Sequence, residues 1–385
     1  MSVNRVLKQI TASIYRERPT VPLEKRTNYR KERVNGACLC DLWFLTVGCV
    51  HDMHGGCTMC NYGKGSSEIE WDSVVAELRE MIKGLPSEFG DFLLTPSGSM
   101  LDEREVSAEQ REQIIDLLKD IKTQSFIIET RADSITDSGI DFMKRVVPDA
   151  EKYIEIGLET SDDWVLKHCV NKNSSFEAFA DAVYRLHKNG IHTIANIGMG
   201  IPFLSERTII KSTIQSIYDA FRIGTDSVVL FPFHVRQGTL LEVMYESGMY
   251  KPVSLWSLVE VLGHFSQQEL DRIQISWYKD YYDPSFSLIR YSPDTCPECR
   301  DEVISLLDRY RDTQDQECIR ALQNISCECK SKWETNISNQ PDSIRINEVE
   351  DMYRKLAAVF HIDESLLECE LQIMRRDFLR RRKND

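Results

Sequence analysis

The sequence has no apolar run close to the roughly 20 residues that a transmembrane helix requires, although 42% of its 385 residues are hydrophobic. Its N-terminus carries Arg5 and Lys8 where a secretory signal peptide needs an apolar stretch. Internal repeats and low-complexity segments are also missing. We therefore expect a cytoplasmic globular protein, with one large domain plus a smaller one and no membrane partner.

Positive charge is in short supply. The chain has 47 basic and 61 acidic residues and a formal net charge of −14. An acidic surface repels phosphate backbones, so tight nucleic-acid binding would need a local basic patch. Residues 16–33 and 375–383 are the two basic stretches. Each is open to two interpretations, a solvated surface or a nucleic-acid contact.

Cysteine is abundant, with twelve residues. In a chain without a secretion signal, clustered cysteines indicate metal binding rather than a disulfide framework. Two residues, Cys169 and Cys369, stand alone and are expected to be ordinary thiols. The others form one group of Cys38, Cys40, Cys49, Cys57 and Cys60, and a second of Cys296, Cys299, Cys318, Cys327 and Cys329.

Short apolar runs alternate with amphipathic stretches through the first two thirds of the chain. The runs are short enough for buried parallel strands, and the stretches between them have helical periodicity, with Ser107 and Ser205 as expected N-caps. This order predicts an α/β fold, a partial (βα)6 TIM-like barrel with its chemistry at the C-terminal strand ends. The runs are 42–47, 92–95, 126–130, 153–159, 192–201 and 227–233.

We divide the chain into four regions. Residues 1–40 are expected to form a basic, strand-poor N-terminal extension, and residues 41–250 the partial barrel. Residues 251–340 form a C-terminal cysteine-rich region, and 341–385 a helical C-terminal extension.

The first cysteine loop follows the first apolar run. Cys49, Cys57 and Cys60 provide three thiolates, which fit three irons of a [4Fe–4S] cluster whose fourth iron stays open for S-adenosylmethionine (SAM). The alternative is a zinc site in which His51 or His54 joins Cys57 and Cys60. Placement directly after the first strand of a β/α array favours the cluster.

Polar residues also follow the other apolar runs. Glu129 and Arg131 are two positions apart, so both should point to the inner face as a charged pair. For SAM we expect contacts from Tyr62, Ser97, Gly98, Ser99, Glu129, Arg131, Glu159, Asn196 and Gly198. Substrate-binding or catalytic candidates are Glu155, His234, Arg236 and Gln237.

The cysteine loop, the glycine turn and the polar strand ends together resemble the radical SAM superfamily. Runs such as GGCTMCNYGKG, SGSMLDEREV, IGLET and FPFHVRQGTLLE are most similar to the radical SAM subunit of archaeosine synthase, in the Elp3-like group. The resemblance implies an enzyme of lyase or transferase type. It would reductively cleave SAM at a [4Fe–4S] cluster held by Cys49, Cys57 and Cys60, and the resulting 5′-deoxyadenosyl radical would abstract hydrogen from the substrate.

The resemblance also implies a substrate and partners. The substrate would be a lysine-bearing 7-deazaguanine in tRNA, in which a C–N bond breaks, and the partners an external electron donor of flavodoxin or ferredoxin type and a second subunit. Two alternatives remain open. One is a radical SAM enzyme of small-molecule or natural-product biosynthesis, including transfer of the aminocarboxypropyl group of SAM. The other is a non-catalytic zinc-binding adaptor.

The second cysteine group places a CxxC pair before a CxC pair. Cys296, Cys299, Cys327 and Cys329 supply four thiolates for a second metal, either zinc in a small structural knuckle or an auxiliary iron–sulfur cluster. A site without metal is also open. Cys318 is the weakest ligand candidate. Cys38 and Cys40 are expected to be spare thiols, and contact with the substrate or with a second metal is the alternative.

Overall fold

The structure is a computed structural model that describes residues 3–85, 89–279 and 289–381. Within these ranges the main sheet has the order β1-β2-β3-β4-β5-β6-β7-β9, and β10 pairs with β8 in a separate ribbon. β1 and β2 are antiparallel, whereas the later neighbours in the sheet are parallel. The strands are β1 (Thr27–Val34), β2 (Ala37–Phe44), β3 (Asp91–Pro96), β4 (Ser125–Thr130), β5 (Glu151–Glu159), β6 (His192–Met199), β7 (Ser227–Pro232), β8 (Val235–Arg236), β9 (Ile273–Ile275) and β10 (Ile289–Tyr291).

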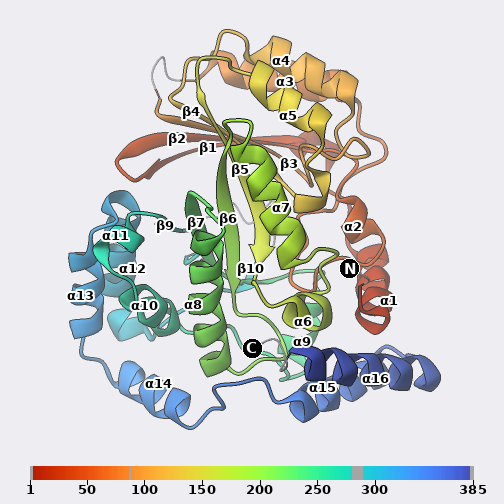
Figure 1. Cartoon of the computed structure of the whole chain (residues 1–385), viewed down its shortest axis with the longest axis vertical. Coiled ribbons are helices and arrows are strands. Elements are labelled where there is room, and N and C mark those ends of the chain that lie inside the picture. Colours follow the sequence, from red (N-terminus) through yellow and green to blue (C-terminus); the bar gives the residue numbers. More distant parts are fainter. Residues whose placement is uncertain (1–2, 86–88, 280–288, 382–385) are drawn as a thin grey trace.

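Helices cover the outer face of the curled sheet (Figure 1). Those of the barrel are α2 (Val50–Met53), α3 (Trp71–Lys83), α4 (Ala108–Leu118), α5 (Asp137–Arg145), α6 (Asp163–Val165), α7 (Phe176–His187), α8 (Glu206–Arg222) and α9 (Leu240–Glu246), with a π-helical turn, η3 (Leu166–Val170), after α6. Ser107 and Ser205 cap α4 and α8 as predicted, each accepting a hydrogen bond from a first-turn backbone N–H. The predicted partial TIM-like α/β barrel is therefore confirmed.

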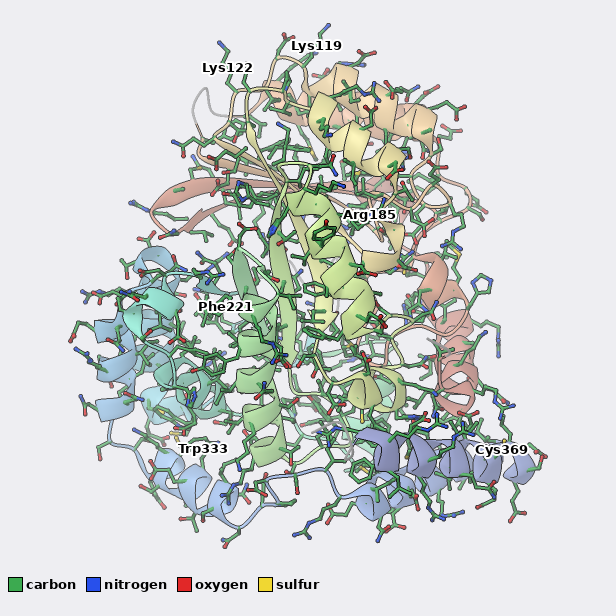
Figure 2. All side chains as sticks on the ribbon, viewed as in Figure 1. Lys119, Lys122, Arg185, Phe221, Trp333 and Cys369 are labelled. Carbon is green, nitrogen blue, oxygen red and sulfur yellow. The ribbon has the colours of Figure 1, made fainter. Side chains whose placement is uncertain are left out.

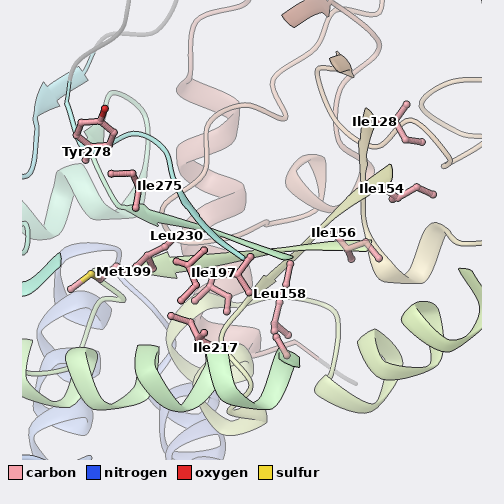
Figure 3. Close-up of a cluster of buried hydrophobic side chains, with 14 of the residues drawn as sticks. Ile128, Ile154, Ile156, Leu158, Ile197, Met199, Ile217, Leu230, Ile275 and Tyr278 are labelled. Carbon is pink, nitrogen blue, oxygen red and sulfur yellow. The ribbon is translucent and has the colours of Figure 1, made fainter. Parts of the chain in front are cut away.

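Strict alternation along the strands separates core from cavity, because successive side chains of a strand point to opposite faces. The residues of β4, β5 and β6 that face the helices are apolar and buried, among them Ile128, Ile154, Ile156 and Ile197. Figure 3 shows these side chains gathered with Ile217 of α8 and Leu230 of β7. The intervening residues point inward, so the same strands build the core and the site.

The N-terminal region differs from the prediction of a strand-poor extension. After α1 (Arg5–Glu17), β1 and the first part of β2 lie before residue 40, so the boundary predicted there falls inside a strand. β1 has no apolar run because it is the edge strand of the sheet, where charged residues are tolerated. Its basic residues also pair with acids: Arg30 bonds Asp41 at 2.8 Å, and Arg33 bonds Asp312 at 3.1 Å.

The C-terminal part is mostly helical, as predicted. α12 reaches β1, where Asn35 N–H donates to Arg311 O at 3.0 Å, and it stands beside the β7–β9 end of the sheet with α10, α11 and α13 (Figure 1). These helices are α10 (Leu255–Gly263), α11 (Gln267–Leu270), α12 (Pro297–Thr313), α13 (Gln316–Asn324) and α14 (Glu328–Ser338). Across the described ranges, no helix is both long and apolar enough to cross a membrane.

The last two helices, α15 (Ile346–Val359) and α16 (Glu364–Arg381), form an antiparallel pair below the barrel (Figure 1). They pack against α1 and the α6–η3 segment. Trp164 Nε1–H donates to Met374 O at 3.0 Å, and Tyr353 Oη–H donates to His168 O at 2.7 Å. The C-terminal extension therefore supports the segment that leads into Asn171.

Candidate active site

A cavity of about 770 Å³ occupies the inside of the curled sheet. Inward residues of β2 to β7 line its wall, and Cys49, Cys57 and Cys60 line it at the C-terminal strand ends. The structure thus brings the three predicted cysteines to one surface of one cavity. In the described chain no three Cys, His, Asp or Glu ligand atoms of this loop are close enough to share a single ion. A zinc site built from His51 or His54 is therefore not formed.

The cysteine loop is fixed at both ends by buried polar contacts. Cys49 N–H donates to Gly63 O at 2.8 Å, which closes the loop on itself. Arg18 from the N-terminal region forms a buried ion pair with Asp52 at 2.7 Å and donates to Cys60 O at 3.2 Å. The predicted basic stretch therefore contributes one residue that holds the loop.

Asn171 holds the middle of the same loop. Its side-chain amide donates to Gly55 O at 2.9 Å and to Gly56 O at 3.0 Å. The segment before it also contributes, because Thr58 N–H donates to Val170 O at 3.0 Å. A Cβ on Gly55 would lie 2.2 Å from Lys8 O of α1, so this glycine is required for packing against α1.

A charged network stands beside Cys49. Arg131 pairs with Glu105 at 2.7 Å and with Asp102, and its Nη1 lies 3.4 Å from Cys49 Sγ. Glu105 in turn accepts from Val50 N–H at 2.8 Å and from Ser99 N–H at 2.5 Å. Burial and the Glu105 carboxylate raise the pKa of the Cys49 thiol, and the Arg131 guanidinium opposes this by favouring the thiolate.

Gly98 is the residue of the glycine turn that reaches the cavity. Its φ of +136° lies in a region that side chains rarely adopt, and a Cβ there would be 2.3 Å from the Glu105 carboxylate. Only glycine lets the turn pass between Glu105 and the cysteine loop.

Lys172 and Glu159 form a second ion pair, beside Cys57. Lys172 Nζ lies 2.8 Å from Glu159 Oε1, and each side chain is only 9% exposed. Burial lowers the pKa of the Lys172 ammonium, but the Glu159 carboxylate and Cys57 outweigh it and the pKa is raised. Lys172 is therefore charged and adds a second cation next to the cysteine loop.

Two carboxyl groups sit side by side deeper in the cavity. Glu129 of β4 is in register with Glu155 of β5, Thr95 bonds Glu129, and Asn196 Nδ2–H donates to Glu155 at 3.2 Å. Burial, reinforced by the Glu129 carboxylate, raises the pKa of Glu155 to about 8. One of these two groups therefore carries a proton at neutral pH.

The charged pair predicted between Glu129 and Arg131 is not formed, because the two residues bond different partners. Both still line the cavity. Strand β4 ends at Thr130, so Arg131 leaves the strand and turns toward Asp102 and Glu105 rather than lying above Glu129.

Aromatic rings with guanidinium groups stacked on them form another part of the cavity wall. Arg236 Cζ lies 4.4 Å from the ring centroid of Tyr62 and 4.7 Å from that of Trp277. His234 Nε2 is 2.6 Å from Trp277 O and its Nδ1 is 3.0 Å from Ser292 Oγ. A carbonyl only accepts, so Nε2 carries the proton, and burial lowers the imidazole pKa to about 3. His234 is thus a neutral, oriented side chain.

Several acceptor atoms in the cavity have no partner in the described part of the chain. They are buried, and they all belong to residues that line the cavity. Buried polar atoms are normally hydrogen-bonded, so a set of orphaned acceptors indicates a ligand that donates hydrogen bonds. The atoms are Asp41 Oδ1, Glu159 Oε2, Asn196 Oδ1 and Gln274 Oε1.

Four predicted site residues do not line the cavity. Ser97 Oγ bonds Thr46, and Ser99 Oγ bonds Thr130, so both serine side chains stabilise the turn from behind. Gly198 provides room for the Phe233 ring, which would lie 2.3 Å from its Cβ. Gln237 contributes its backbone carbonyl to Asn61 at 3.0 Å.

Sequence reasoning missed Lys172, Asn171 and Trp277. Asn171 and Lys172 follow the π-helical turn η3, and Trp277 follows β9, a three-residue strand that was not among the predicted runs. No local pattern marks them, since each acts through a residue distant in sequence. Asp41 is the exception. It is a charged residue one position before the predicted strand at 42–47, and the period-2 rule would have placed it on the inner face.

The second predicted cysteine group is also assembled. The four Sγ atoms of Cys296, Cys299, Cys327 and Cys329 all lie within 4.8 Å of one another. Cys318 lies apart from this group, buried in the core. Cys40 is likewise on the core side of β2, with Cys38 packed against the same core.

This chain is similar in sequence to radical SAM proteins. Residues 43–213 match the model of the family described as Radical SAM superfamily. Archaeosine synthase subunit beta of Methanosarcina acetivorans is 29% identical over 341 residues, which cover 86% of this chain and 95% of the relative. The protein of the same name from Thermococcus kodakarensis is 29% identical over 302 residues, 76% of this chain and 90% of the relative.

A solved structure of Methanocaldococcus infernus Elp3 with an N-terminal deletion aligns with a TM-score of 0.44 at 18% identity. The alignment covers 56% of this chain and 55% of that chain.

Proposed function

This chain contains a radical SAM domain and is related to archaeosine synthase subunit beta, and from this premise we propose that Cys49, Cys57 and Cys60 bind a [4Fe–4S] cluster. With SAM at its open iron, such a cluster supplies the electron that breaks a C–S bond of SAM and yields a 5′-deoxyadenosyl radical. The donor set fits, because three thiols line the cavity without forming a single-ion site in the described chain. Arg131 and Lys172 offset the negative charge of the bound thiolates.

SAM is proposed to bind at the C-terminal strand ends, between the cysteine loop and the aromatic part of the cavity wall. Gly98 lets backbone approach the methionyl part, and the unpartnered Oε2 of Glu159 accepts from the ribose hydroxyls. The exposed edge of Tyr62, 36% accessible, is available to the adenine. Arg131 and Asn196 complete this part of the cavity wall.

The observation that supports a substrate class is the excess of acceptors deeper in the cavity. Asp41, Asn196 and Gln274 each leave a buried oxygen without a donor in the described chain. Glu129 and Glu155 line the same cavity, and Glu155 accepts from Asn196. A cationic, donor-rich group such as a lysine ammonium or an amidine satisfies these atoms. The leading proposal is therefore C–N bond cleavage on a lysine-bearing 7-deazaguanine in tRNA.

Protein partners follow from the same relationship. The relatives are named as the beta subunit of a synthase, and a chain with a net charge of −14 needs help to hold RNA. We propose that a second subunit supplies the RNA contact. An external electron donor of flavodoxin or ferredoxin type delivers the electron, in the cytoplasm, where cysteines stay reduced.

The test is anaerobic reconstitution of the full chain with iron and sulfide, followed by SAM, a reductant and tRNA that carries the lysine-bearing base. The wild type is expected to bind about four irons per chain at this site and to release 5′-deoxyadenosine. The Cys49→Ala, Cys57→Ala, Cys60→Ala variant should do neither, whereas Cys369→Ala, at an exposed thiol, should behave as wild type.

Substrate identity needs a separate readout. Glu155→Gln is expected to retain SAM cleavage in the absence of substrate but to raise KM for the modified tRNA. Iron binding without conversion of this tRNA, with or without a partner subunit, would contradict the substrate proposal and leave the radical SAM assignment standing. Failure to bind iron would contradict both.

A further inference from the structure

The second cysteine group lies outside the cavity, where two helices begin. Cys296 immediately precedes α12 and Cys299 is its third residue, while Cys327 immediately precedes α14 and Cys329 is its second residue. The Sγ atoms lie 3.6 Å apart in Cys296 and Cys299, 3.4 Å apart in Cys296 and Cys327, and 3.5 Å apart in Cys299 and Cys329.

These separations fit one metal ion rather than a cluster. A tetrahedral zinc with Zn–S bonds of about 2.3 Å places its sulfurs about 3.8 Å apart. In a [4Fe–4S] cluster each thiolate binds a different iron, so four sulfurs cannot all stay within the 4.8 Å observed here. Structural zinc sites are commonly built from two short cysteine pairs whose four sulfurs surround one ion. Here the pairs are a CxxC and a CxC.

The surroundings are arranged for thiolates. The N-termini of α12 and α14 converge on the four sulfurs, and backbone N–H groups at a helix start favour negative charge. Trp256 Nε1–H donates to Cys329 Sγ at 3.2 Å, an outer contact that orients a ligand. Lys330, the residue after Cys329, places its Nζ 5.4 Å from the centroid of the same Trp256 ring.

The group is tied to the cavity wall by the chain that enters it. Ser292, four residues before Cys296, bonds His234, and Asp294 O accepts from Leu255 N–H at the start of α10 at 3.2 Å. On the other side, α12 runs from the sulfurs to Arg311, which lines the cavity. A metal that holds the start of α12 in place would therefore also help to position His234 and Arg311 at the cavity wall.

We propose that Cys296, Cys299, Cys327 and Cys329 bind one zinc ion, which holds α12 and α14 together and anchors the segment that positions His234. Zinc is preferred over iron at such a site because thiolate sites bind Zn²⁺ more tightly than Fe²⁺. The role is structural, because four protein ligands leave no open coordination position.

The experiment compares metal content after anaerobic purification and iron–sulfide reconstitution of the full chain. Wild type is expected to contain about one zinc per chain beside its iron. The Cys49→Ala, Cys57→Ala, Cys60→Ala variant should lose iron and keep zinc. The Cys327→Ser, Cys329→Ser variant should lose zinc and keep iron. Cys369→Ser is the matched control, since Cys369 on α16 lies far from Trp333 of α14 (Figure 2) and the control should keep both.

A second measurement covers the case in which the double variant fails to fold. Zinc in the wild-type chain is exchanged for Co²⁺ with a mild chelator, and the spectrum is recorded. Thiolate-to-cobalt charge-transfer bands together with the d–d pattern of a tetrahedral site are expected. Three results would each overturn the proposal: wild type without zinc, about four extra irons that depend on Cys296 and Cys327, or an octahedral cobalt spectrum. None of these results tests the iron–sulfur cluster proposed at the cavity cysteines.

Discussion

Asn171 offers a direct test of how the cysteine loop is held. It is fully buried, and its amide donates to two successive loop carbonyls, Gly55 O and Gly56 O. Its backbone is left-handed, with φ of 61° and ψ of 34°. Two substitutions separate these features. Asn171→Gly keeps the backbone conformation and removes the amide, and Asn171→Ala removes the amide and also strains the backbone.

The expected magnitude follows from these contacts. Each hydrogen bond contributes about 1 kcal/mol net, and a buried carbonyl left without a donor costs about 1–3 kcal/mol. Asn171→Gly should therefore lower the free energy of unfolding by about 2–4 kcal/mol. An alanine in the left-handed region adds about 1–2 kcal/mol, so Asn171→Ala should be the less stable of the two.

Urea unfolding of the metal-free chain under reducing conditions measures both values. Iron content after reconstitution then reports on the loop, because Gly56 directly precedes Cys57. Both variants should lose iron to a chelator faster than wild type. The reasoning is refuted if Asn171→Gly unfolds at the wild-type urea concentration, or if Asn171→Ala is as stable as Asn171→Gly.

Three further outcomes are expected. Lys172→Met leaves Glu159 buried without its partner and should lower the free energy of unfolding in urea by about 3–5 kcal/mol. The Lys172→Met, Glu159→Gln double variant should recover most of this loss. Equal stability of the single and the double variant would contradict this reasoning. Because Glu155 has a pKa of about 8 in the folded chain against 4.5 ordinarily, the folded state binds the extra proton, so stability of the apoprotein should fall as pH rises through this window. Glu155→Gln should flatten that slope, and an unchanged pH profile would show that burial does not hold the proton. Asp377→Asn weakens the bonds to Lys167 and His168, of 2.8 and 3.1 Å, and should speed proteolysis at α16, whereas protection equal to wild type would show that the contact is dispensable.

The pattern of inner and outer residues could be predicted because it is local. Apolar runs with period-2 spacing place Ile128 and Ile154 on the core face, and the same periodicity puts Glu129 and Glu155 inside. The six strands β2 to β7, the helices between them and the inward carboxylates therefore follow from the order of residues alone. The edge strand β1 did not, since a strand with one solvent-facing side and charged residues has no apolar run to reveal it.

The cysteine loop was visible in the sequence because its ligands are close in the chain. By itself, the sequence determined that Cys49, Cys57 and Cys60 share a loop after a strand, and that Cys296, Cys299, Cys327 and Cys329 come in two pairs. Only the tertiary structure decided what surrounds them. Lys172, Asn171 and Arg18 reach the loop from distant segments. The pairs from α12 and α14 meet through long-range contacts that no local spacing encodes: α12 packs on α13, which packs on α10, and α14 bonds α10 through Trp333 and Ser257.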